Sequence, residues 1–124
     1  VYTMKAKESE AVKYFANCFL ATKVMVFNEM KVLCDNISDI NYDRIIDGVV
    51  SDPRIGYSHT AVPGPDGDYG FGGTCFPKDI NALIHTMEEF DMNPIVLKSV
   101  WEQNKNYRTE WDWSQNQSAV RSES

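Results

Sequence analysis

The sequence predicts an all-α domain, in which shorter helices and one long loop rich in glycine and proline join a long central helix. Residues 8–36 contain neither proline nor glycine and are rich in residues that favour helices. Glycine and proline gather instead in residues 51–74. After this loop, apolar residues return with the three- and four-residue spacing of a helix that has one buried face. The 124 residues suit a single domain.

The long helix predicted over residues 8–36 is apolar around most of its circumference. Its apolar side chains follow two lines, Phe15, Phe19, Val26 and Leu33 along one, and Tyr14, Cys18, Met25 and Val32 along the other. Such a helix is usually buried on several sides. Two explanations remain open: a second copy of the chain covers part of the helix, or the rest of the same chain wraps it.

The next elements are a helix over residues 42–50 and an irregular loop over residues 51–74. Turn residues before Tyr42 mark the start of the helix. A loop as long as 51–74 is usually functional or disordered, and its aromatic and apolar content favours a functional loop.

Two further helices are predicted after the loop. One covers residues 77–90, because proline suits the first turn of a helix. The other begins near residues 93–94. Residues 114–124 are polar and rich in serine, which predicts a flexible polar tail.

The overall composition excludes several classes of function. The net charge of −6 argues against a nucleic-acid interface, which needs a clustered basic face, and against a polybasic membrane surface. No apolar run approaches the roughly 20 residues that cross a bilayer, and no leader peptide is visible. We expect a cytoplasmic protein without a metal site, because Cys18, Cys34 and Cys75 lack zinc-ligand spacing. Cys18 and Cys34 are expected to be small buried apolar residues.

The candidate for chemistry is Cys75, in the segment Gly70-Phe71-Gly72-Gly73-Thr74-Cys75-Phe76-Pro77-Lys78-Asp79. Cys75 falls at the N-terminus of a predicted helix, where free N–H groups stabilise a thiolate. Asp79 lies one turn further along and can face the same point. From the residues alone, two interpretations stay open: Cys75 is a nucleophile, or Cys75 is a packing residue and Asp79 only complements the helix dipole.

A second candidate cluster is Lys13 and Asn17, which are four residues apart on one face of the long helix. An ammonium and an amide at this spacing are suited to stabilising an oxyanion. Alternatively, Lys13 is a surface lysine whose stem covers apolar neighbours. His59 and His85 raise a third possibility, a Cys–His hydrolase, but no sequence feature orients either histidine.

Several segments of the sequence resemble the central domain of the UDP-glucose/GDP-mannose dehydrogenase family. They are Glu10-Ala11-Val12-Lys13-Tyr14-Phe15-Ala16-Asn17, Phe27-Asn28-Glu29, Asp52-Pro53-Arg54-Ile55-Gly56 and the Gly70–Asp79 segment, in the family's order. The resemblance covers about residues 1–113 and implies a fold similar to the C-terminal helical domain of 6-phosphogluconate dehydrogenase. The stretch from Ser58 to Gly67 is most similar to the bacterial UDP-glucose branch.

The resemblance implies a two-step oxidation of a sugar-nucleotide alcohol to an acid with two NAD. It makes Cys75 the nucleophile that carries a thiohemiacetal and then a thioester, with Lys13 and Asn17 stabilising the oxyanion. Asp79 would position the hydrolytic water. Residues implied to contact the UDP-sugar are Arg54, which would reach it from a neighbouring subunit, Tyr57, Phe71, Gly72 and Gly73. The long first helix would form a homodimer.

The family's NAD-binding Rossmann domain and its second nucleotide-binding domain have no counterpart in the 124 residues. We therefore expect no NAD to bind this chain alone, and expect turnover only with a separate NAD-binding domain. The alternative is a non-catalytic dimerisation module, or a relic fragment, that retains the motif.

Overall fold

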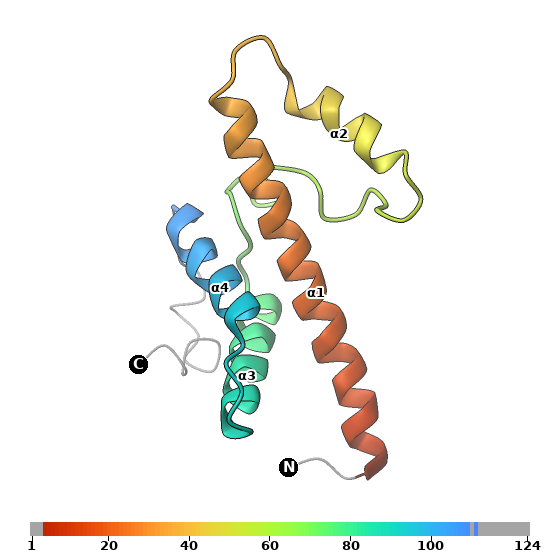
Figure 1. The fold of residues 1–124 in the computed structure, drawn as a ribbon, viewed down its shortest axis with the longest axis vertical. Helices are drawn as coiled ribbons and strands as arrows, with labels where there is room; N and C mark the ends of the chain where they lie inside the picture. The colour runs from red at the N-terminus through yellow and green to blue at the C-terminus, as the bar shows by residue number, and fades with distance from the viewer. Residues whose placement is uncertain (1–3, 110, 112–124) are drawn as a thin grey trace.

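The computed structural model describes residues 4–109 and 111, and these residues form four helices without a strand. The helices are α1 (Met4–Asp35), α2 (Tyr42–Val50), α3 (Cys75–Glu89) and α4 (Ile95–Tyr107) (Figure 1). The predicted all-α fold class is thus confirmed. The predicted tail over residues 114–124 lies outside the described residues.

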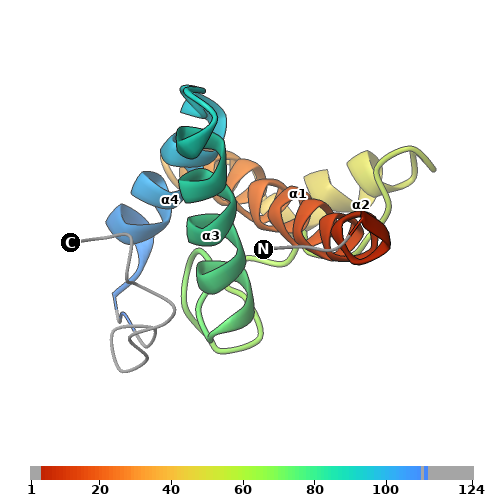
Figure 2. The same cartoon turned by 90° about the horizontal axis from the view of Figure 1, so that it is seen from below.

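Helix α1 is a long rod with the other helices on two sides of it. In both ribbon views, α3 and α4 lie on one side of α1 and α2 lies on the other (Figures 1 and 2). Helices α3 and α4 also pack against each other, whereas α2 packs against α1. The 32 residues of α1 therefore separate two parts of the chain.

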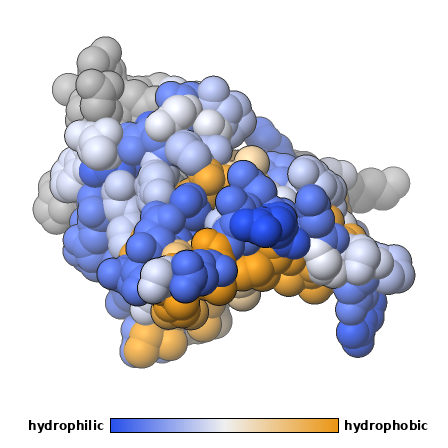
Figure 3. Space-filling view, turned by 90° about the horizontal axis from the view of Figure 1, so that it is seen from above, coloured by the Kyte–Doolittle hydropathy of each residue, from blue (hydrophilic) through white to orange (hydrophobic). Residues whose placement is uncertain are grey.

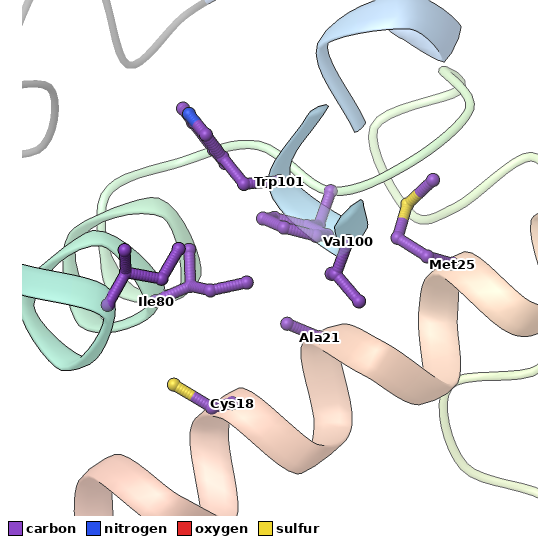
Figure 4. Packing of buried hydrophobic residues seen from close by; sticks show 8 residues of the cluster. Cys18, Ala21, Met25, Ile80, Val100 and Trp101 are labelled. Atoms are coloured by element: carbon purple, nitrogen blue, oxygen red, sulfur yellow. The ribbon is translucent and has the colours of Figure 1, made fainter. Parts of the chain in front are cut away.

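Two apolar clusters hold these parts together. Between α1, α3 and α4 the buried residues are Cys18, Ala21, Met25, Phe71, Ile80, Ile84, Val100 and Trp101 (Figure 4). The cluster between α1, α2 and the loop contains Phe27, Tyr42, Ile46 and Val62. Cys18 is a packing residue, as predicted, and Cys34 is half-buried beside the second cluster.

The helix boundaries agree with the sequence prediction within a few residues. The bounds of α2 are those predicted. Helix α3 begins at Cys75, two residues before the predicted start at Pro77. Pro77 then occupies the first turn, where its missing N–H removes no helical hydrogen bond. The first such bond runs from the N–H of Lys78 to the carbonyl of Thr74 (3.0 Å).

Side chains from the helices hold the irregular loop over residues 51–74. The Lys23 ammonium donates to the carbonyl of Ile55 (2.8 Å), and the Tyr42 hydroxyl donates to the carbonyl of Thr60 (2.6 Å). Near the other end of the loop, the Arg108 guanidinium pairs with Asp66 (2.8 Å). The loop is thus fixed at several points without forming a helix or strand.

One line of apolar side chains on α1 is not covered by the rest of the chain. The exposed members are Val12, Phe15, Phe19, Val26, Met30 and Leu33. Their spacing of three, four or seven residues places them along one face, here called the apolar stripe. In the view from above, apolar surface gathers along one side of the molecule (Figure 3). The all-round apolar pattern of α1 therefore has two origins, an internal core and this exposed stripe.

None of the described helices is long and apolar enough to cross a membrane.

The raised pKa values of two buried side chains, Cys18 and Tyr42, predict a loss of stability at alkaline pH. Burial, with a smaller effect of Asp79, raises the pKa of the Cys18 thiol from 9.0 to about 12. Burial likewise raises the pKa of Tyr42 from 10.0 to about 12. Both groups lose their proton at a lower pH in the unfolded chain than in the folded chain. Between pH 9 and 12 the unfolded state therefore binds fewer protons than the folded state. The free energy of unfolding should fall as the pH rises, by up to about 1.4 kcal/mol per pH unit for each group.

Urea unfolding at several pH values between 9 and 12 measures this dependence. Tyr42→Phe should reduce the decline above pH 10, whereas Tyr57→Phe at an exposed position should not. Equal slopes in the two variants would contradict the assignment to Tyr42.

Candidate functional site

Cys75 is the first residue of α3 and its side chain is exposed. The preceding residue, Thr74, caps the helix without a side-chain hydrogen bond to it. Free backbone N–H groups at a helix N-terminus, together with the helix dipole, stabilise a negative charge. Cys75 is therefore accessible and lies beside the free N–H groups of the helix N-terminus.

Asp79 lies one turn after Cys75 and is completely buried. Its Oδ2 accepts a hydrogen bond of 2.6 Å from the Asn17 amide on α1. Its Oδ1 accepts no hydrogen bond from the described residues, although the Lys78 ammonium is 3.7 Å away. A buried carboxylate oxygen without a hydrogen bond is costly, so this atom is free to bind a donor from a ligand or water.

One hydrogen bond and one helical turn relate three of the predicted site residues to one another. Residues four apart on a helix share a face, so Cys75 and Asp79 lie on the same side of α3. The Asn17 amide reaches that side from α1. The structure thus brings an amide and a carboxylate together one helical turn from the exposed sulfur.

Lys13 lies in a different position relative to Cys75. Asn17 pairs with Asp79, whereas the earlier residues Ala11 and Tyr14 of α1 line a groove with the later residues Leu83 and Met87 of α3. The two helices therefore run antiparallel. Lys13 precedes Asn17 by four residues and Cys75 precedes Asp79 by four. They therefore lie on opposite sides of the Asn17–Asp79 bond, separated along the helix axes by about 12 Å. Lys13 is exposed and makes no ion pair within the described part of the chain.

The residues predicted to contact a sugar nucleotide divide into two groups. Phe71 is buried between Trp101 and Phe76, with ring centroids 6.2 and 5.9 Å apart, so its ring belongs to the core. Gly72 is half-buried, and Gly73 is exposed with nothing within 4 Å of the position its Cβ would take. The backbone of these two glycines is therefore the accessible part of the segment.

Arg54 and Tyr57 form the second group, in the loop after α2. The Arg54 guanidinium is 87% exposed and binds both carboxylate oxygens of Asp52. The loop directly after α2 lies on the side of α1 away from α3 (Figures 1 and 2), but by His59 it has returned to pack against Phe76 beside Cys75. Within a single chain, Arg54 pairs with Asp52 and makes no hydrogen bond or ion pair to the described residues of α3.

The two histidines do not form a catalytic pair with Cys75. The His59 ring packs against Phe76, with centroids 5.8 Å apart, and His85 faces Glu89 on α3 at 3.5 Å. Among the described residues, neither histidine hydrogen-bonds the sulfur. The geometry gives no support to a Cys–His hydrolase.

Sequence reasoning missed two buried amides, Asn28 on α1 and Asn104 on α4. Asn28 accepts a hydrogen bond from the N–H of Gly70 (2.7 Å), and Asn104 accepts one from the N–H of Phe71 (2.7 Å). The available signal was an asparagine at a core-facing helix position, since a buried amide needs partners. The sequence does not reveal which backbone groups it binds.

The described residues do not fit a metal or a dinucleotide. They contain no group of three His, Cys, Asp or Glu side chains that could hold a metal ion. The family implied by the sequence uses NAD, but the glycine-rich segment joins α2 to α3 and follows no strand. A dinucleotide fingerprint requires a strand before its glycines.

The chain is similar to known proteins over most of its length. The profile of the UDP-glucose/GDP-mannose dehydrogenase family, central domain, matches residues 7–106. A UDP-glucose 6-dehydrogenase of Rickettsia typhi is 45% identical over 97 residues, which are 78% of this chain and 21% of the relative. For the Pseudomonas aeruginosa enzyme of the same name, identity is 39% over 104 residues, 84% of this chain and 22% of the relative.

A Bacillus subtilis UDP-glucose 6-dehydrogenase is 33% identical over 106 residues, which cover 86% of this chain and 23% of the relative. The chain thus spans about a fifth of the length of these relatives.

The Asn17–Asp79 bond predicts a large loss of stability on truncation of the amide. Asn17→Ala should lower the free energy of unfolding by about 2 to 4 kcal/mol, because a buried carboxylate then loses its hydrogen bond. Adding Asp79→Asn to this variant should restore part of the loss, because a neutral amide is less costly to bury.

Chemical denaturation measures these differences. The matched control is Asn106→Ala, which removes an exposed amide bond to Gln103 and should change stability by about 0.5 kcal/mol or less. A similar loss in both single variants would contradict the role of the bond.

Proposed function

Because the chain belongs to the UDP-glucose/GDP-mannose dehydrogenase family, we propose that residues 1–113 are the substrate-binding and dimerisation domain of a UDP-glucose 6-dehydrogenase. The names of the relatives support this substrate. The observation that carries the proposal is the buried Asp79 carboxylate, whose Oδ1 accepts no hydrogen bond from the described residues and lies one helical turn from the exposed Cys75.

Cys75 is proposed to add to the aldehyde carbon of the partly oxidised sugar. The S–C bond forms while the carbonyl oxygen receives the proton, so the addition gives a thiohemiacetal without a change in oxidation state. The Asn17 amide donates one N–H to Asp79, and its second N–H remains available to the developing oxyanion. Lys13 would contribute its positive charge from the other side of the Asn17–Asp79 bond.

NAD supplies the oxidant for both oxidation steps of the family's reaction, and it would bind on another domain. The last step, hydrolysis of the thioester, uses residues of this chain. Oδ1 of Asp79 is proposed to accept a hydrogen bond from the attacking water and orient it. Water adds to the acyl carbon, the C–S bond breaks, and the products are the uronic acid and the Cys75 thiol.

Arg54 and Tyr57 are proposed to bind the UDP-sugar in the site of a neighbouring subunit. This proposal is supported by the exposure of both side chains in the loop after α2. Guanidinium groups suit diphosphate recognition. The backbone of Gly72 and Gly73 is the proposed contact within the same subunit.

The proposed dimer contact is the apolar stripe of α1. Phe15 and Phe19 are 59% and 67% exposed, which is unusual for phenylalanine side chains on a helix that also faces a core. Pairing two such stripes would bury them.

The alternative function is a dimerisation module without catalysis. It would share the apolar stripe and the fold, but it would not require the Asp79 carboxylate oxygen near Cys75. Reconstitution of turnover separates the two functions.

Mixing this chain with a separately produced NAD-binding domain of a UDP-glucose 6-dehydrogenase should restore oxidation of UDP-glucose, measured as NADH absorbance. Cys75→Ala should reduce that turnover by about a thousandfold or more, because no covalent intermediate can form. The matched control Cys34→Ala alters a half-buried thiol beside the other cluster and should retain activity. Turnover that is absent although the two proteins bind each other would favour the non-catalytic module.

The apolar stripe predicts a mass in solution near twice 14.1 kDa, measured by light scattering. Phe19→Glu should give a monomer, because a carboxylate would be buried in the contact. Phe90→Glu is the matched control, since Phe90 is also exposed but follows α3 and lies outside the stripe. Dissociation by the control alone would place the contact elsewhere.

A further inference from the structure

We propose that Asn28 and Asn104 are positioning residues that fix the backbone leading to Cys75. The inference rests on the proposed function, because it explains how the fold holds the nucleophile of that function. Both amides act on Gly70 and Phe71, which precede Cys75 by five and four residues.

Asn104 binds both backbone groups of one residue. Its Oδ1 accepts from the N–H of Phe71 at 2.7 Å, and its Nδ2 donates to the carbonyl of Phe71 at 3.0 Å. This is the pairing that a neighbouring β-strand would provide. Because Asn104 is completely buried, loss of the amide would leave two backbone groups without a partner.

Asn28 connects the same segment to α1. Its Oδ1 accepts from the N–H of Gly70 at 2.7 Å, while its Nδ2 donates to the Val24 carbonyl within the helix, also at 2.7 Å. Only 1% of Asn28 is exposed. The backbone at Gly70 and Phe71 is thus held from α1 and α4 together, here called the amide clamp.

The clamp requires glycine at position 70. Gly70 has a φ of +69°, which other residues rarely adopt. A Cβ on Gly70 would also collide with Oδ1 of Asn104 and lie 3.3 Å from Cδ of Arg108. The conformation of the chain and the close approach of the amide therefore depend on each other.

From the clamp, aromatic packing extends to Cys75. The Phe71 ring contacts Trp101 on α4 and meets the Phe76 ring edge-on. Phe76 directly follows Cys75, so the residues on both sides of the segment 72–75 are held in place. Within the segment, Gly72 is half-buried and residues 73–75 are exposed. The position of the Cys75 sulfur is therefore set by Phe71 and Phe76, the residues that flank the segment 72–75.

Hydrogen exchange of the unmodified chain is the first test. The amides of Gly70 and Phe71 should exchange about as slowly as the amide of the core residue Ile80, because their hydrogen bonds open only with the fold. Exchange as fast as at the exposed loop residue Tyr57, while Ile80 stays protected, would overturn the proposal.

The second test compares Asn104→Ser with Tyr42→Phe. Serine is too short to bind both backbone groups of Phe71. Tyr42→Phe is the matched control, because it removes one buried hydrogen bond to the loop backbone, at Thr60, and leaves the bonds to Gly70 and Phe71 in place. Asn28→Ser removes the bond to Gly70 and the intrahelical bond to Val24 but leaves both bonds of Asn104 in place, and it replaces Asn104→Ser if that variant does not fold.

The readouts are the rate of Cys75 alkylation by iodoacetamide and the kinetics of the reconstituted enzyme. Asn104→Ser should slow Cys75 labelling several-fold at neutral pH, because the start of α3 is no longer held, and leave Cys34 labelling unchanged. It should lower kcat about tenfold or more with a smaller change in KM. Tyr42→Phe should lower stability while leaving the Cys75 labelling rate and kcat unchanged. Equal effects of the two variants would overturn the proposal and leave only a structural role.

Labelling needs neither substrate nor the NAD-binding domain, so the two proposals can fail separately. A labelling contrast without any reconstituted turnover would support the clamp and count against the proposed function. Turnover that is the same in Asn104→Ser and the unmodified chain would overturn the clamp alone.

Discussion

The hydrogen bond between Asn17 and Asp79 fixes the register of α1 against α3, and the arrangement of the candidate site depends on it. Apolar contacts such as those of Ala21 and Ile80 favour association of the helices but tolerate sliding, since the hydrophobic effect has no direction. A hydrogen bond of 2.6 Å to a completely buried carboxylate does not tolerate sliding of one helix along the other. If one helix moved by a turn, the carboxylate would be left without a partner. One interaction therefore specifies both helix packing and the position of Cys75.

Buried polar groups in this domain serve two distinct purposes. Both side-chain polar atoms of Asn28 and of Asn104 have partners, so these amides hold the backbone. Asp79 uses one oxygen in the same way and keeps the other without a hydrogen bond from the described residues. A buried oxygen without a hydrogen bond lowers stability, and such costs are concentrated at functional sites. The contrast separates the residues that build the site from the residue that can receive a ligand.

Helix composition and spacing were sufficient to predict the fold class, the bounds of α2 and the burial of Cys18. The sequence also named Asn17 and Asp79 as candidate site residues, and the structure joins these two side chains by a hydrogen bond. Helix composition and spacing did not predict the direction of α3, which places Lys13 and Cys75 on opposite sides of the Asn17–Asp79 bond. Helical spacing describes one helix at a time, so it contains no information on the relative direction of two helices. For the same reason, the pairing of Asn104 with Phe71, 33 residues away in the sequence, was not predictable.

Helix α1 also sets the distance and the relative rotation between two parts of the domain. Its 32 residues span about 48 Å, and Lys23, which anchors the Arg54 loop, follows Asn17 by six residues. Adding or deleting one residue between them would rotate the loop by about 100° around the rod relative to α3. Length changes in this interval are therefore compatible with the fold only near whole turns, whereas the connection between α1 and α2 has no such periodic restriction.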